Sequence, residues 1–146
     1  MVLIGVQGYY QILFISLCRI LAVQAEVLGD GPLLPTLKAA WPGAQFRGWL
    51  SKPDLSKRLS SAKALVVPSL WYENSPMIIA EAASLGIPVI VSDGGAASTL
   101  VEDGVTGLHF KNGDAADLAM KIAMLQNNPE QAFVMSETAY NRFWQS

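Results

Sequence analysis

The sequence predicts an α/β protein, a Rossmann-like doubly wound parallel sheet with helices on both faces. Short strand-like segments alternate with helix-like segments along the 146 residues, which is the order expected of parallel βαβ units. The segments 64–68 and 88–92 are almost continuously apolar, as expected for strands that are covered on both faces. Hydrophobic residues make up 51% of the chain and charged residues only 15%, so a sizeable core is available.

The first half of the chain is expected to contain four strands, at Val2–Val6, Glu26–Leu28, Gln45–Leu50 and Ala64–Pro68. Between the first two lies a strongly apolar segment, Tyr9–Val23. No basic region precedes it, which argues against a signal peptide, and Arg19 interrupts it, which argues against a membrane span. It is therefore expected to be a buried helix.

Helix boundaries follow from proline, glycine and capping residues. Pro32 suits the first position of a helix that runs to Ala40, and Asp54 is expected to cap a helix that runs to Ser61. In the second half, the expected elements are a helix from Ser75-Pro76 to Gly86, a strand at 88–92, a helical turn at 97–101, a strand at 106–110, a helix capped by Asp114 and running to Gln126, and a last helix at 130–144.

Composition excludes several classes of site. A net charge of −2 gives no electrostatic footprint for nucleic acid. One cysteine, Cys18, cannot form an internal disulfide and fits a reducing compartment. One histidine, His109, excludes a histidine-rich metal site; because His109 continues an apolar strand, a structural role is expected for it.

Three loops follow predicted strands, and in open α/β sheets ligands bind outside the carboxyl ends of strands. Gly29-Asp30-Gly31-Pro32 is a weak match to a dinucleotide fingerprint, because Leu34 stands where a third glycine is needed. A tight turn explains it equally well. Ser92-Asp93-Gly94-Gly95-Ala96 would let a ligand approach the backbone closely, but it also reads as an ordinary turn.

The third loop carries two carboxylates, Glu73 and Glu81, with seven residues between them. Ser75-Pro76 opens a helix, so the first backbone amides, near Met77, would offer a seat for a diphosphate. Helical side chains lean toward the N-terminus, which brings Glu81 near that mouth, where a carboxylate would accept hydrogen bonds from vicinal hydroxyls. This combination predicts a nucleotide sugar. The alternative left open is that Glu73 is an exposed loop acid and Glu81 caps a neighbouring backbone.

From about Glu26 to Gln126 the chain resembles the C-terminal half of a GT-B glycosyltransferase of the large retaining family 4, the group 1 glycosyltransferases. The order and spacing of several short motifs carry the resemblance: Leu28-Gly29-Asp30-Gly31-Pro32, Phe46-Arg47-Gly48-Trp49, Val67-Pro68-Ser69, the set Glu73, Pro76, Glu81, Ala82 and Gly86, Ile87-Pro88-Val89-Ile90, and Asp103-Gly104-Val105-Thr106-Gly107-Leu108.

The resemblance implies a donor site for a UDP- or GDP-sugar, with no metal and no further cofactor. By it, Glu73 is the catalytic-site carboxylate that hydrogen-bonds the transferred sugar, and Glu81 binds the nucleotide ribose. The remaining donor-binding residues would be Asn74, Ser75, Pro76 and Met77 at the diphosphate and sugar, Trp49 and Leu50 beside the base, and Gly29 and Gly31 in the first loop. The reaction would be transfer of a hexose, with retention, to a glycan, polysaccharide or lipid acceptor.

Two departures from the family limit this expectation. Gln7-Gly8 stands where the family carries a phosphate-binding lysine, and no arginine precedes it. The N-terminal acceptor domain is absent, so residues 1–146 are expected to be a fragment that binds donor without turnover. A cytoplasmic location is expected, with membrane association at the inner face left open. Two alternatives remain: a degenerate non-catalytic binding or interaction module, and half of a GT-B sugar-nucleotide epimerase, which would need additional acid/base residues.

Overall fold

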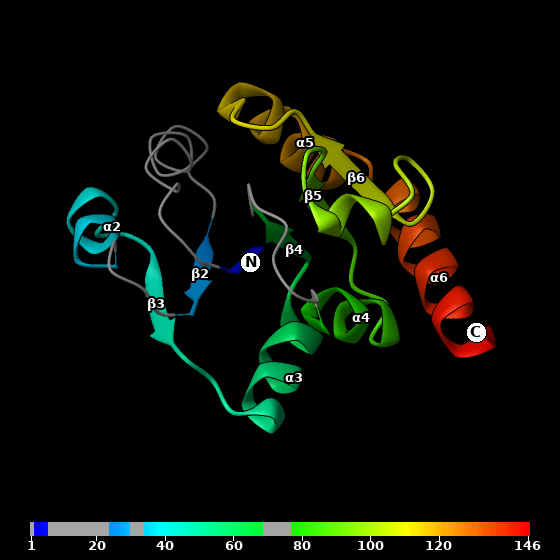
Figure 1. Cartoon of the computed structure of the whole chain (residues 1–146), viewed down its shortest axis with the longest axis horizontal. Coiled ribbons are helices and arrows are strands. Elements are labelled where there is room, and N and C mark those ends of the chain that lie inside the picture. Colours follow the sequence, from blue (N-terminus) through cyan, green and yellow to red (C-terminus); the bar gives the residue numbers. More distant parts are fainter. Residues whose placement is uncertain (1, 6–23, 30–33, 69–76) are drawn as a thin grey trace.

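A computed structural model describes residues 2–5, 24–29, 34–68 and 77–146. Its centre is a parallel sheet of six strands in the order β3-β2-β1-β4-β5-β6 (Figure 1). The strands are β1 (Val2–Gly5), β2 (Ala25–Leu28), β3 (Gln45–Gly48), β4 (Ala64–Val67), β5 (Val89–Ser92) and β6 (Gly107–Phe110). The predicted strands all exist, each within about two residues of its expected ends.

The sheet is doubly wound. The chain starts at β1 in the middle, adds β2 and β3 on one side, and then returns to place β4, β5 and β6 on the other. All pairs are parallel, with Leu3 opposite both Glu26 and Leu65. The strand order therefore reverses between β1 and β4, and the predicted fold class is confirmed.

The helices are α2 (Leu34–Ala40), α3 (Lys52–Ser61), α4 (Met77–Ser84), the 3₁₀ helix η1 (Ala96–Thr99), α5 (Ala115–Asn127) and α6 (Pro129–Gln145). Asp114 caps α5 as predicted, with its carboxylate accepting from the N–H of Asp117 at 3.0 Å. The prediction that Asp54 caps α3 is wrong. Ser51 is the cap, because its hydroxyl accepts from the N–H of Asp54 at 3.4 Å and donates to the Asp54 carboxylate at 2.8 Å.

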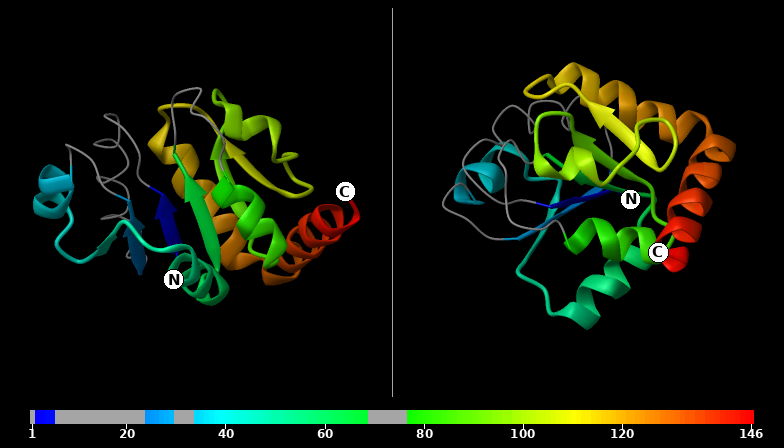
Figure 2. Two further views of the ribbon diagram at one scale, coloured as in Figure 1. Left: turned by 60° about the horizontal axis from the view of Figure 1, so that its bottom comes forward. Right: turned by 45° about the vertical axis from the view of Figure 1, so that its right-hand side comes forward.

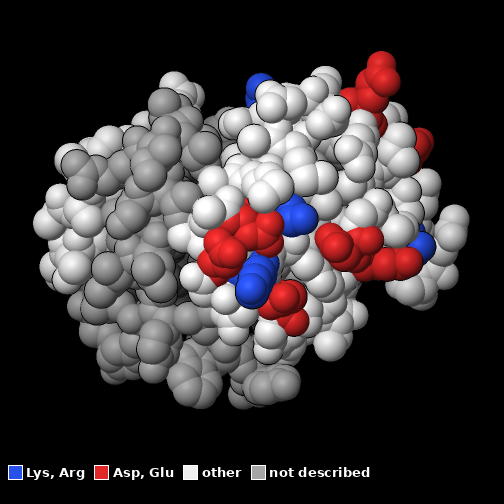
Figure 3. Space-filling view, turned by 90° about the horizontal axis from the view of Figure 1, so that it is seen from above, with Lys and Arg blue, Asp and Glu red and all other residues white. Residues whose placement is uncertain are grey.

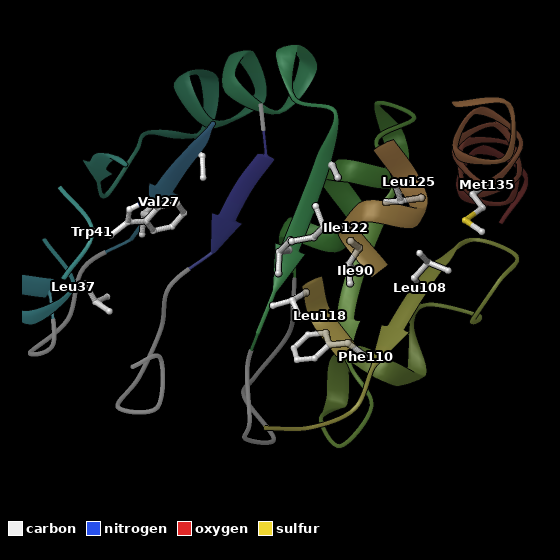
Figure 4. Packing of buried hydrophobic residues seen from close by; sticks show 13 residues of the cluster. Val27, Leu37, Trp41, Ile90, Leu108, Phe110, Leu118, Ile122, Leu125 and Met135 are labelled. Carbon is white, nitrogen blue, oxygen red and sulfur yellow. The ribbon is translucent and has the colours of Figure 1, made fainter. Parts of the chain in front are cut away.

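Each face of the sheet carries its own hydrophobic core. On one face, Leu37 of α2 and Leu118, Ile122 and Leu125 of α5 pack with the strands, together with Met135 of α6 (Figure 4). On the other face, Leu59 of α3 and Ile79 and Ala82 of α4 pack against Leu65 and Val91. Because Leu65 and Val66 are both fully buried and belong to opposite cores, the continuous apolar pattern of β4 reflects burial on both faces.

Gly86 ends α4 as predicted. It adopts φ = +68°, and the N–H groups of Gly86 and Ile87 donate to the carbonyls of Ala83 and Ala82 at 3.0 and 2.9 Å. These two bonds form a Schellman motif, which satisfies the last carbonyls of the helix. The predicted helix 9–23 lies outside the described residues, and so does Pro32, the expected first residue of the helix that ends at Ala40. Within the described residues, no helix is both long and apolar enough to cross a membrane.

Candidate functional site

The carboxyl ends of all six strands meet at one edge of the sheet. The strand order reverses between β1 and β4, so the crevice where ligands of doubly wound sheets bind lies above these two strands. The loops that follow them, residues 6–23 and 69–76, fall outside the described residues. The described part of this edge has three pieces: the corner after β2 and β3, the start of α4, and the loop after β5.

At the first piece, two glycines hold the ends of β2 and β3 together. Gly29 adopts φ = 109° and Gly48 φ = +66°, and the Gly29 N–H donates to the Gly48 carbonyl at 2.8 Å. Positive φ at both positions favours glycine. The chain then presents Trp49, which is 81% exposed, while Leu50 packs against the α3–α4 core. The indole of Trp49 is therefore exposed at this edge of the sheet.

At the second piece, α4 carries one charged side chain, Glu81, in the sequence Met-Ile-Ile-Ala-Glu-Ala-Ala-Ser. Its Oε2 is buried and has no hydrogen-bond partner among the described residues. A buried carboxylate oxygen without a donor costs more than a neutral polar group would. Glu81 lies one turn into the helix, and its side chain leans toward the N-terminal end at Met77, which is exposed.

At the third piece, the loop after β5 packs tightly against the loop after β6. The Asn112 N–H donates to Asp93 Oδ1 at 2.9 Å, and a Cβ on Gly94 would lie 2.8 Å from Asn112 Nδ2. A side chain at position 94 would therefore require the Asn112 side chain to move. The Ser92 hydroxyl is buried without a partner among the described residues. No signal in the sequence pointed to Asn112.

The structure thus brings Gly29, Trp49, Leu50, Met77 and Glu81 to the same edge of the sheet. The other predicted site residues, Gly31, Glu73, Asn74, Ser75 and Pro76, lie outside the described residues, as do Gln7 and Gly8. Their roles stay predictions.

The described residues contain no group of three or more His, Cys, Asp or Glu side chains that could hold a metal ion. His109 has local partners: its Nε2 lies 2.5 Å from the Val101 carbonyl and its backbone N–H donates to Asp103 at 2.8 Å. Acidic and basic side chains intermix on the described part of the face in Figure 3, where no basic patch forms.

Several known proteins are similar to this chain. A sulfoquinovosyl transferase of Arabidopsis thaliana is 28% identical over 141 residues, which are 93% of this chain and 28% of the relative. An α-D-kanosaminyltransferase of Streptomyces kanamyceticus is 27% identical over 80% of this chain and 31% of its own length. The chain therefore spans about a third or less of these relatives.

Two solved structures are similar in fold. The Anabaena HepE structure in complex with UDP and glucose superposes with a TM-score of 0.83 at 20% identity, over 99% of this chain and 43% of that one. The catalytic domain of cholesterol-α-glucosyltransferase from Helicobacter pylori gives 0.78 at 18% identity, over 98% of this chain and 97% of that one. The fold of this chain therefore matches that of these two neighbours, which is the GT-B type. The family model for glycosyl transferases group 1 matches residues 37–142, and the chain belongs to this family.

Proposed function

We propose that this chain is the C-terminal, donor-binding domain of a retaining GT-B glycosyltransferase of family 4, and that it binds a UDP- or GDP-sugar. The relatives named as glycosyltransferases extend well beyond the matched region, which leaves room for an acceptor-binding domain in the full-length protein. The acceptor would be a glycan, polysaccharide or lipid. The protein would act in the cytoplasm, with docking to the inner face of the membrane through other parts of the chain.

The observation that carries this proposal is the buried Oε2 of Glu81, which has no hydrogen-bond partner among the described residues. A vicinal diol offers two hydroxyl donors, which is what a buried carboxylate lacks. A phosphate would be repelled at the same place. Glu81 is therefore assigned to the ribose hydroxyls of the nucleotide, and its burial cost would be offset when the nucleotide binds.

The diphosphate would lie at the N-terminal end of α4. The first amides of a helix have no intrahelical acceptor and carry the positive end of the helix dipole. Met77 begins the described helix, one turn before Glu81, so a ribose at Glu81 and a phosphate at the helix mouth lie within the span of one nucleotide. Glu73 and the segment Asn74–Pro76 are proposed to contact the sugar and diphosphate just ahead of that mouth.

The base is proposed to lie at the corner formed by β2 and β3. Gly29 and Gly48 have no side chains, so a flat group can approach their backbone, and the neighbouring Trp49 indole is exposed enough to stack on it. Gly31 is proposed to extend this base-binding surface. Base, ribose and diphosphate would then follow the carboxyl edge from β3 to α4.

Chemistry by the isolated chain is not expected. Glu73 would hold the transferred sugar by its hydroxyls, and the α4 amides would be the groups that stabilise charge on the departing diphosphate. Gln7-Gly8 supplies no cation in place of the family's lysine. Without an opposing domain to orient an acceptor, the expected result is donor binding and no turnover.

Calorimetric titration with UDP, GDP, UDP-glucose and GDP-mannose tests the donor site. Diphosphate nucleotides should bind, and Glu81→Ala should weaken binding roughly 10- to 100-fold, as expected for lost hydrogen bonds to a charged group. The matched control is Glu130→Ala at the exposed start of α6, which should change nothing. Absence of binding to every nucleotide at about 1 mM would refute the proposal.

A nucleotide lacking the ribose hydroxyls separates the ribose role from a general effect on folding. The unmodified chain should prefer UDP to 2′,3′-dideoxy-UDP, and Glu81→Ala should bind the two equally well. If the variant kept the full preference, another residue would be the ribose partner.

Trp49→Ala should weaken UDP binding by about 1 kcal/mol through lost stacking, and Met120→Ala, another exposed apolar truncation, should not.

A further inference from the structure

Helix α6 carries a row of large side chains that no described residue covers. Phe133, Tyr140 and Trp144 are 66%, 45% and 63% exposed, and Glu137 is also exposed. The spacing 133, 137, 140, 144 places all four on one face of the helix. The buried residues Met135 and Ala139 lie on a different face. Figures 1 and 2 show α6 at the outer edge of the molecule.

Two of the exposed rings, Tyr140 and Trp144, have ordered contacts despite their exposure. Trp144 Nε1 donates to the Ser84 carbonyl at 3.3 Å. The Trp144 ring also lies 6.2 Å from the Tyr140 ring and meets the Phe143 ring edge-on at 5.1 Å. A preordered aromatic surface loses little conformational entropy when it is covered, which makes it a favourable anchor for an interface.

The row is complementary to itself. Its spacing of four, three and four residues is that of a coiled-coil seam, and it reads the same in both directions. If two copies of α6 pack antiparallel about a twofold axis midway between Glu137 and Tyr140, each Phe133 meets the partner's Trp144. Each Tyr140 hydroxyl then meets the partner's Glu137 carboxylate and can donate to it. We propose that this face of α6 joins two copies of the chain in an isologous dimer.

Charge favours a second copy over a membrane surface. The charged residues of α6 are Glu130, Glu137 and Arg142, and Glu137 lies in the middle of the aromatic row. Arg142 forms an ion pair with Glu102, with 2.5 Å between Arg142 Nη1 and Glu102 Oε2. A helix that lies on anionic lipid needs lysine or arginine beside its apolar face, which α6 does not provide. A phenol opposite Glu137 gives this carboxylate a donor, whereas lipid acyl chains would leave it without one.

The size of the row sets the expected strength. Three rings that are each about half to two-thirds exposed offer about 300–400 Å² per copy, which is about half of the roughly 800 Å² per partner in a standard interface, so a weak, concentration-dependent dimer is expected. The groove beside Phe133, about 600 Å³ and lined by Lys63, Ile87 and Pro88, adds room for the partner's Trp144. These residues mark the amino ends of β4 and β5, so the dimer would leave the opposite, carboxyl edge of the sheet open to nucleotide.

Sedimentation of the whole chain over a concentration series up to about 1 mM tests the dimer. A reversible monomer–dimer equilibrium is expected. Tyr140→Glu should weaken the dimer at least 10-fold, because it places four carboxylates at the twofold axis. Val134→Glu, an equally exposed position on another face of α6, should leave the equilibrium unchanged. A chain that stays monomeric at the highest concentration, or equal loss in both variants, would overturn the proposal.

A mixing experiment tests whether the row pairs with itself. The acidic variant Tyr140→Glu and the basic double variant Glu137→Lys/Tyr140→Lys should each be monomeric, and an equimolar mixture should dimerise. Circular dichroism checks that both variants are folded, which is expected because both positions are exposed. Folded variants that remain monomeric when mixed would show that these two residues do not face each other.

Discussion

Gly107 at the start of β6 offers a stability test whose size follows from geometry. It pairs with Val89 in the parallel register, and a Cβ built on it would lie 2.3 Å from the Val89 carbonyl oxygen and 2.7 Å from a Val101 methyl group. The backbone oxygen cannot rotate away, and Val101 is itself buried. Gly107→Ala therefore forces β6 away from β5 by about 1 Å, since carbon and oxygen atoms need more than 3 Å.

Overpacking of this kind costs about 1–3 kcal/mol. For a chain of this length that corresponds to a fall in Tm of about 3–10 °C. Urea unfolding followed by circular dichroism measures the free energy directly, and a thermal scan checks the Tm. Two other glycines calibrate the result. Gly43→Ala meets nothing within 4 Å and should be neutral, whereas Gly113→Ala has open space but φ = +73° and should cost about 1 kcal/mol.

From most to least stable, the three variants are therefore expected to rank Gly43→Ala, Gly113→Ala and Gly107→Ala. If Gly107→Ala unfolds at the same urea concentration as Gly43→Ala, the close approach of β6 to Val89 would be wrong. If only the Gly113 variant is destabilised, backbone conformation and not packing would decide the stability of this region.

Three further predictions concern polar side chains. Glu81→Leu should raise the free energy of unfolding by about 1 kcal/mol and lower nucleotide affinity, because it removes a carboxylate oxygen that has no donor among the described residues. Urea unfolding without and with UDP measures both effects. Glu26→Leu should leave the free energy of unfolding in urea unchanged or raise it by up to about 2 kcal/mol. The reason is that Glu26 Oε2 is buried without a described partner, and that Arg47 and Arg58, which contact Oε1, are partly exposed. A clear fall in the free energy of unfolding would show that this ion cluster stabilises the fold. Ser51→Ala should lower the thermal midpoint by an amount equivalent to about 1 kcal/mol, because it removes the cap of α3, whereas an Asp54 cap would leave Ser51→Ala neutral.

The strand and helix pattern was predictable because it depends on neighbouring residues. The apolar runs of β4 and β5, the glycine after α4 and the capping aspartate of α5 are local signals, and each element was found. The α3 cap was misplaced because Ser51 and Asp54 are both good capping residues three positions apart, and they bond each other. Only the three-dimensional start of the helix at Lys52 distinguishes them.

The candidate site divides in the same way. The sequence alone indicated the charged Glu81 within an apolar helix and the resemblance to the family, because residue type and spacing carry that information. The place of Trp49 beside the base was implied only by that resemblance. The tertiary structure decided that Glu81 Oε2 is buried without a described partner, that the Asn112 N–H donates to Asp93, and that the aromatic row of α6 is exposed. Burial and pairing depend on which residues distant in the chain come to lie beside each other, and no local pattern in the sequence encodes that.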